Sequence, residues 1–225
     1  MISKKEQLFD QWPEAYDRWF ETPMGSLIKK YETALLLDLL NPQRGEKILD
    51  AGCGTGVFTL DVLSKGSHVI GMDISWPMLK QARKKAEGYP MNMVLADILR
   101  LPFQENAFDK VISVTTLEFI EDAKGVIEEL FCVTKRGGYI VVATLNSLSP
   151  WASLRKAKKD HPLFEKAIFR SPDELLSLIP VEGTVRTTVH FQKEDDPNRA
   201  QEIEQEGKEK GLNTGAFVAV RWEKP

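Results

Sequence analysis

The stretch Asp50-Ala51-Gly52-Cys53-Gly54-Thr55-Gly56 decides the fold that this chain is expected to adopt. The segment Lys47-Ile48-Leu49 before it is typical of a short strand with apolar side chains, and the apolar positions of residues 57–63 suit a helix packed on a sheet. Glycines between a strand and a helix let the backbone turn tightly and approach a ligand without obstruction by Cβ atoms. The following helix offers N–H groups to an anionic part of that ligand, so the stretch predicts a strand–loop–helix binding unit.

Strand and helix patterns alternate on the carboxyl side of this unit. Ser75 is placed to cap one helix, and Asp122 caps another that is expected to run to about Lys135, with a turn at Gly137-Gly138. Further strands are expected at residues 68–73, 92–96, 110–114 and 139–143. Such alternation predicts an α/β fold with a parallel sheet and helices on both faces.

The two ends of the chain have a different pattern. Residues 5–20 and 25–41 are interpreted as two helices that could form a lid, separated around Pro23. In the tail, Ser171 opens a short helix to about Ile179, and residues 184–191 and 216–222 alternate like antiparallel strands. The charged residues 193–211 between those strands are expected to form an exposed loop with some helix.

Composition sets limits on location and partners. The 225 residues are 42% hydrophobic and 28% charged, as in an ordinary folded domain, and no long apolar run or secretory signal is present, so a cytoplasmic protein without a membrane span is expected. Cys53 and Cys132 are too few for a Cys-rich zinc site, and no metal is predicted. A net charge of −3 makes nucleic acid an unlikely partner, and the basic cluster at residues 155–159 is interpreted as a solvated helix face.

Three carboxylates mark the ends of successive expected strands: Asp50, Asp73 and Asp97. Ligands of open α/β sheets bind outside these carboxyl ends. The loop is G-x-G-x-G, and Val57 stands where a dinucleotide-binding loop needs its third glycine. Asp73 is placed to accept hydrogen bonds from ribose hydroxyls and Asp97 from an amino group of adenine. Ile74 and Ile98 are expected to enclose the adenine ring.

Four motifs in this order resemble those of class I S-adenosylmethionine-dependent methyltransferases, and of the small-molecule type that acts on ubiquinone and menaquinone precursors. The motifs are Ile48 to Gly56, Gly71-Met72-Asp73-Ile74-Ser75, Ala96-Asp97-Ile98 with Leu101-Pro102-Phe103, and Phe108-Asp109-Lys110-Val111. The resemblance spans about residues 45–145. It implies a Rossmann-like, mostly parallel seven-stranded sheet with an antiparallel last strand and an N-terminal helical lid.

The resemblance also implies S-adenosylmethionine as cofactor and assigns residues to its parts. Asp50, Gly52, Cys53, Gly54 and Gly56 would hold the methionine end, Cys53 through its backbone N–H, while Asp73 holds the ribose. Asp97 and Ile98 would hold the adenine, and Thr115 would lie beside the methyl group.

Methyl transfer from a sulfonium is an in-line displacement in which positioning can supply much of the acceleration, so no catalytic base is assigned. Glu118 and Tyr16 are the positioning candidates, and Tyr16 with Trp19 is expected to cover the cofactor. Thr115-Thr116-Leu117-Glu118-Phe119 lacks the Asn/Asp-Pro-Pro-Tyr/Phe segment of amino-methylating DNA enzymes, which favours a small-molecule acceptor. Residues 146–151 are either an acceptor wall or a capped loop with Trp151 as a packing anchor.

The expected organisation is one methyltransferase domain over residues 1–225. It comprises a helical cap at 1–41, the cofactor-binding core at 45–145 and a C-terminal part at 146–225. Two alternatives stay open at this stage: an NAD-type Rossmann oxidoreductase, and a module that binds the S-adenosyl group without catalysis. The acceptor and the oligomeric state are left open.

Overall fold

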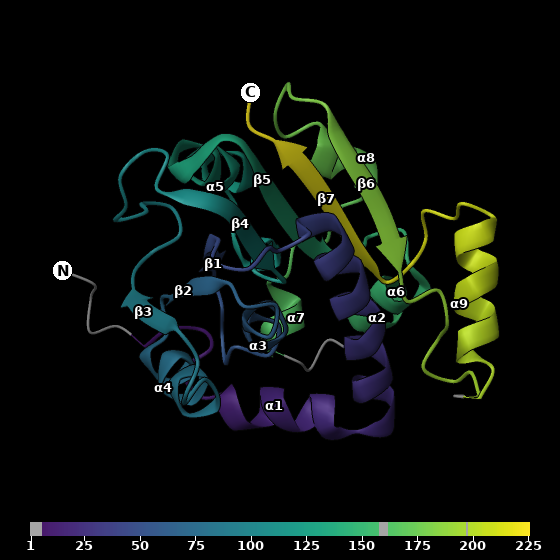
Figure 1. The fold of residues 1–225 in the computed structure, drawn as a ribbon. Coiled ribbons are helices and arrows are strands. Elements are labelled where there is room, and N and C mark those ends of the chain that lie inside the picture. Colours follow the sequence, from purple (N-terminus) through teal and green to yellow (C-terminus); the bar gives the residue numbers. More distant parts are fainter. Residues whose placement is uncertain (1–5, 158–161, 197) are drawn as a thin grey trace.

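A seven-stranded sheet in the order β3-β2-β1-β4-β5-β7-β6 forms the centre of the computed structural model, which describes residues 6–157, 162–196 and 198–225 (Figure 1). β7 pairs antiparallel with both of its neighbours, whereas the other pairings are parallel. The predicted Rossmann-like sheet with an antiparallel last strand is therefore confirmed. The strands are β1 (Lys47–Ala51), β2 (His68–Asp73), β3 (Met91–Leu95), β4 (Phe108–Val114), β5 (Thr134–Leu145), β6 (Gly183–Thr188) and β7 (Phe217–Glu223).

Helices cover both faces of this sheet, as expected. Neighbouring residues of each central strand point to opposite faces, and the side chains on both faces are buried. Ile48 packs with α2 and α3, and Leu49 packs with α5 and α8. The helices are α1 (Pro13–Glu21), α2 (Pro23–Leu40), α3 (Thr59–Leu63), α4 (Trp76–Lys85), α5 (Ala123–Val133), α6 (Pro150–Ala157), α7 (Pro162–Glu165), α8 (Pro172–Leu176) and α9 (Ala200–Glu209), with a 3-10 turn η1 (Leu117–Phe119).

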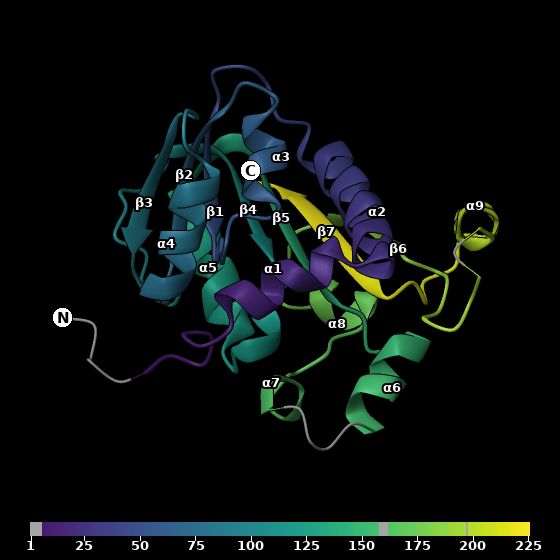
Figure 2. The same ribbon diagram turned by 90° about the horizontal axis from the view of Figure 1, so that it is seen from below.

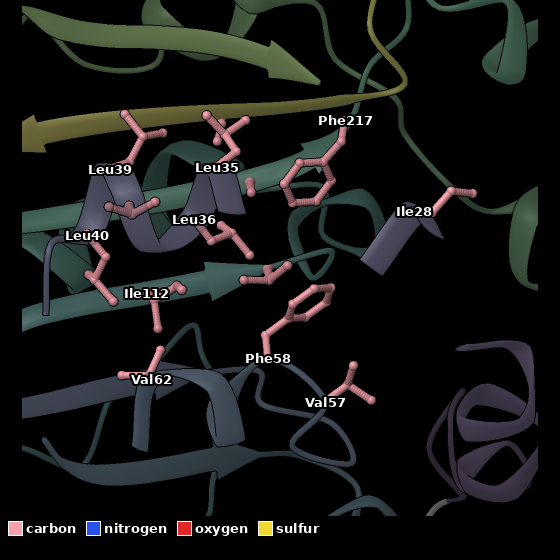
Figure 3. Close-up of a cluster of buried hydrophobic side chains, with 14 of the residues drawn as sticks. Ile28, Leu35, Leu36, Leu39, Leu40, Val57, Phe58, Val62, Ile112 and Phe217 are labelled. Atoms are coloured by element: carbon pink, nitrogen blue, oxygen red, sulfur yellow. The ribbon is translucent and has the colours of Figure 1, made fainter. Parts of the chain in front are cut away.

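The N-terminal pair of helices divides into a core helix and a covering helix. α2 lies on one face of the sheet and inserts Leu35, Leu36 and Leu39 between Ile112 and Phe217 of the strands and the α3 region (Figure 3). α1 contributes no fully buried residue and crosses the carboxyl edge of the sheet instead (Figure 2). The sharp change of direction falls at Thr22, whose hydroxyl accepts the Gly25 N–H at 3.0 Å and caps α2.

The turn expected at Gly137-Gly138 is wrong, because both glycines lie inside the long strand β5. Gly137 has a φ of 72°, which favours glycine. Its N–H donates to the carbonyl of Lys224, the residue after β7, at 2.8 Å. A Cβ on Gly138 would lie 2.4 Å from the Asp109 carbonyl oxygen. The two glycines therefore allow an irregular strand between tightly packed neighbours.

The charged segment 193–211 is also more ordered and more buried than an exposed loop. α9 packs on β6 through Ala200, Glu204 and Gly207. The Glu204 carboxylate accepts hydrogen bonds from the Thr188 hydroxyl and from the His190 N–H. In the sequence Glu204 looks like a surface charge, because the two groups that donate hydrogen bonds to it lie outside its own helix.

Among the described residues, no helix combines the length and apolar character needed to cross a membrane.

Candidate active site

The glycine loop between β1 and α3 is shaped by positive φ angles at Gly52, Gly54 and Gly56, of 83°, 52° and 77°. A Cβ on Gly52 would lie 2.3 Å from the Thr116 hydroxyl oxygen, so this glycine allows η1's approach to the loop. A Cβ on Gly54 would meet nothing within 4 Å. The loop thus leaves one open side, where a ligand can approach the backbone.

Most of the loop's amides are already used within the fold. The N–H groups of Gly52 and Cys53 both donate to the Met72 carbonyl, at 2.7 and 2.9 Å. The Cys53 N–H, expected to contribute to binding, therefore already has an acceptor within the protein. No hydrogen bond within the described part of the chain uses the N–H groups of Val57 and Phe58, which leaves these two amides for an anionic group.

Asp73, at the end of β2, fixes the loop to the sheet. Its Oδ2 accepts the Gly54 N–H at 2.8 Å and its Oδ1 accepts the Ser75 N–H at 2.8 Å. Burial raises the pKa of Asp73 despite these hydrogen bonds. Each oxygen retains a second lone pair, so the carboxylate can accept from ligand hydroxyls as well.

Asp50, at the end of β1, is buried beneath the loop, and its Oδ2 accepts the Thr59 hydroxyl at 2.5 Å. Its pKa is raised to about 7, chiefly by burial, with the Thr59 hydrogen bond lowering it and the charge of Asp73 raising it. A buried carboxylate in this state gains most from a cationic group nearby. Burial also raises the pKa of the Cys53 thiol well above its ordinary value, which argues against a nucleophilic thiolate.

The adenine candidates lie along the next strand end. Asp97 is exposed and its Oδ1 accepts the Leu99 N–H at 3.0 Å, whereas Ile98 is buried. Asp97, Ile98 and Ile74 line the same cavity as Asp73. The structure therefore brings together the polar and apolar groups that the sequence suggested for a nucleoside.

Thr115 and Tyr16 meet across the cavity, although ninety-odd positions of chain separate them. Thr115 follows β4 with a φ of 48°, and its side chain is hydrogen-bonded to the Tyr16 hydroxyl. Burial raises the pKa of Tyr16, and so do the charges of Glu32 and Glu118, so the phenol stays protonated.

A polar network ties α1 to the glycine loop and to α4. Asp17 Oδ1 accepts hydrogen bonds from the Thr55 hydroxyl at 2.6 Å and from Lys85 Nζ at 2.7 Å, while its Oδ2 accepts Gln81 Nε2 at 3.1 Å. We call Asp17, Thr55, Gln81 and Lys85 the Asp17 network. It holds Tyr16 and Trp19 over the cavity that both residues line.

One cavity of about 1160 Å³ is lined by the strand-end carboxylates Asp50, Asp73 and Asp97 and by Thr115 and Tyr16. This volume exceeds what one small ligand needs, since small-molecule sites commonly measure about 300–1,000 Å³. Beyond the predicted cofactor residues it extends to an apolar chamber, lined by Phe20, Ile28, Phe58, Trp151, Leu154 and Leu163. Trp151 lines this chamber, and its Nε1 donates to the Phe191 carbonyl at 2.8 Å, as suits a packing anchor.

Glu32 and Arg155 are charged residues of the cavity wall that the sequence did not identify as such. Glu32 lies on the buried side of α2, and burial raises its pKa to about 8. Its position four residues after Ile28, within the apolar stripe, was the available signal. Arg155 was interpreted as part of a solvated face, but its guanidinium lies 5.4 Å from the Trp151 ring and burial lowers its pKa. Lys158 and Lys159 of that cluster lie outside the described residues.

Glu118, in η1, is completely buried and lines the same cavity. Its Oε1 accepts the Leu145 N–H at 2.7 Å, which joins the ends of β4 and β5. Burial raises its pKa to about 7, with Arg155 acting in the opposite direction.

Comparison with known proteins connects this arrangement to a family. Residues 49–142 match the model of a methyltransferase domain. The chain is 33% identical to an uncharacterized protein of Methanocaldococcus jannaschii, over 96% of this chain and 98% of the other. It is also 33% identical to the demethylmenaquinone methyltransferase of Clavibacter sepedonicus, over 78% of this chain and 72% of that enzyme.

The fold is similar to that of solved enzymes as well. A S-adenosylmethionine-dependent methyltransferase of Thermotoga maritima superimposes with a TM-score of 0.71 at 23% identity, covering 96% of this chain and 98% of the other. Neither alternative considered from the sequence, an NAD-type oxidoreductase or a non-catalytic module, finds support in these matches. The chain belongs to the class I methyltransferases, and it is an enzyme whose cofactor is S-adenosylmethionine.

Proposed function

We propose that this enzyme transfers the methyl group of S-adenosylmethionine to a small-molecule acceptor by in-line displacement inside the cavity beneath α1. The observation that supports this most is the continuity of the cavity, which runs from the strand ends at Asp50, Asp73 and Asp97 into the apolar chamber at Trp151. A chamber walled by apolar side chains suits a compact organic molecule.

The residues around the glycine loop fit the cofactor's functional groups. Asp50 and the loop, with Gly52, Cys53, Gly54 and Gly56, would hold the amino-acid end, because Asp50 suits the ammonium and the amides of Val57 and Phe58 suit the carboxylate. Asp73 would accept from the ribose hydroxyls and Asp97 from the adenine amino group, with Ile74 and Ile98 against the ring. Thr115 would lie beside the methyl group.

The cofactor's sulfonium supplies an activated methyl group when bound. Asp73 and the loop then fix the nucleoside and the amino-acid end, so that the methyl group faces the chamber. Tyr16 and Trp19 exclude water from above. Orienting the two reactants and excluding water account for much of the acceleration in this proposal.

Transfer of a labelled methyl group from S-adenosylmethionine to components of a small-metabolite extract tests this function. Calorimetric titration with S-adenosylmethionine, S-adenosylhomocysteine and NAD tests the site independently. We expect binding of both S-adenosyl compounds, none of NAD, and label in compounds that pass a small-molecule filter. Label found exclusively in protein or nucleic acid would contradict the proposed acceptor class.

A further inference from the structure

Glu32, Glu118 and Arg155 form one charged cluster in the wall of the apolar chamber. Glu32 comes from α2, Glu118 from η1 and Arg155 from α6, and all three line the cavity. They are close enough to shift one another's pKa values, and the charges of both glutamates also raise the pKa of Tyr16 in α1. Among the described residues, Glu118, Arg155 and Tyr16 are therefore the three titratable groups that act on Glu32 from the surrounding elements.

The carboxylates in this cluster have unused hydrogen-bonding capacity. Glu118 Oε2 is buried and has no hydrogen-bond partner within the described ranges. Glu32 is 6% exposed and makes no hydrogen bond or ion pair with any residue that the structure describes. Burying a carboxylate without partners opposes folding, so this arrangement makes sense where a bound molecule provides donors.

The charges of the cluster favour a cation over an anion. When Glu32 and Glu118 are both ionised, Arg155 can offset one carboxylate, and the second has no compensating charge from Tyr16, which is a neutral phenol. An anionic ligand that approached Arg155 would also approach Glu32 and Glu118. At the rim of the cavity, Lys193 and Glu194 are both exposed and balance each other. A bound cation therefore favours the ionised form of both carboxyl groups in the chamber wall, where one negative charge is then left over to pair with it.

We propose that Glu32, supported by Glu118, binds the protonated nitrogen of the methyl acceptor, and that the acceptor is a small amine with an apolar or aromatic body. This inference rests on the proposed function and names its substrate class. Trp151 and Phe20 offer aromatic surface to that body and to its cationic end.

The same contact prepares the nitrogen for methylation. An ammonium has no lone pair, so its proton first moves to the Glu32 carboxylate. The neutral amine then forms the N–C bond as the S–C bond breaks, with the electron pair of that bond remaining on sulfur. The methylated ammonium carries the positive charge that the sulfonium loses. Burial raises the pKa of Glu32 to about 8, which suits a group that accepts this proton near neutrality.

A matched series of probes tests the proposal: 2-phenylethylamine, 2-phenylethanol and 3-phenylpropionate, titrated calorimetrically into enzyme saturated with S-adenosylhomocysteine. We expect the amine to bind about tenfold more tightly than either other probe, and Glu32→Gln to remove this preference without changing S-adenosylhomocysteine affinity. Glu14→Gln is the control, since it removes an exposed carboxylate from the outer side of α1. It should leave the affinity for the amine unchanged.

Proton release gives a second measurement that needs no variant. At pH 7 free Glu32 is mostly protonated, so binding of an ammonium should release about one proton, measurable by titration in buffers of different ionisation enthalpy. Equal or tighter binding of the alcohol or the acid, or failure of the amine to bind while S-adenosylhomocysteine binds, would overturn the amine proposal alone. Failure of S-adenosylhomocysteine to bind would overturn the proposed function beneath it.

Discussion

Asp73 combines a structural and a binding role in a single carboxylate, because it fixes Gly54 and the start of α4 and still faces the cavity. We expect Asp73→Ala to weaken S-adenosylhomocysteine binding by about 1.5–3 kcal/mol, the contribution of charge-assisted hydrogen bonds. Calorimetry measures the loss. Asp38→Ala, at an exposed ion pair with Arg186, is the control that should bind normally, and wild-type affinity in Asp73→Ala would refute the ribose role.

At this scale, the predictable residues were those whose position follows from local pattern. Asp50, Asp73 and Asp97 could be found because strand ends of a parallel sheet share one edge. Glu32 and Arg155 could not be placed, since their burial depends on how α2 and α6 pack around a cavity, and neither contact is local in sequence. The use of the Cys53 N–H by Met72 likewise depends on how the loop folds back on β2.

The Asp17 network ties α1 to the glycine loop and to α4, and Tyr16 and Phe20 of this helix pack against the core although none of its residues is fully buried. Asp17→Asn keeps the shape of the side chain but removes the charge that binds Lys85. We expect S-adenosylhomocysteine to dissociate several-fold faster while thermal stability changes little, because Asp17 itself lies outside the hydrophobic clusters of the core. Stopped-flow displacement measures the rate, and an unchanged rate would show that the network does not hold the lid.

Tyr16 and Trp19 form the inner surface of this lid, and Trp19 remains 36% exposed. We expect Tyr16→Ala and Trp19→Ala each to lower turnover and cofactor affinity, about tenfold for Tyr16, because aromatic contact and water exclusion are lost. Leu212→Ala, an exposed apolar side chain just beyond α9, is the control. If both lid variants bind and react like the wild type, α1 does not cover the reaction.

The elements themselves were largely predictable, because hydrophobic periodicity and capping residues mark their centres and starts. Ser75 and Asp122 cap α4 and α5 as expected, through hydrogen bonds to the N–H groups of Met78 and Gly125. One error arose because a pair of glycines occurs both in turns and in irregular strands: Gly137 and Gly138 suggested a turn but lie within β5. The α9 segment was misjudged because its charged sequence conceals three buried positions.

The molecule as a whole carries three buried carboxyl groups along one cavity, with pKa values raised to about 7 at Asp50, about 8 at Glu32 and about 7 at Glu118. Unfolded carboxyl groups titrate near pH 4, so the folded enzyme binds more protons between about pH 4 and 8. These groups therefore contribute stability at low pH that is lost as the pH rises through 7 and 8.

We expect the free energy of unfolding of the ligand-free enzyme to fall by at least on the order of 2 kcal/mol between pH 5 and pH 8. Denaturant titration at several pH values measures this change. Glu32→Gln should flatten the dependence and unfold at higher denaturant concentration than the wild type at pH 8. A stability that rises over this range would contradict the burial of these carboxyl groups in their charged form.

The tie between Asp17 and Thr55 also has a kinetic consequence. Thr55 belongs to the loop that would hold the amino-acid end, so α1 and this loop are expected to move together. The acceptor chamber lies farther along the cavity. S-adenosylhomocysteine should therefore be the last product to leave, and its departure should limit turnover. S-adenosylhomocysteine would then inhibit competitively against S-adenosylmethionine and noncompetitively against the acceptor. The rate of the enzyme would therefore depend on the ratio of S-adenosylmethionine to S-adenosylhomocysteine.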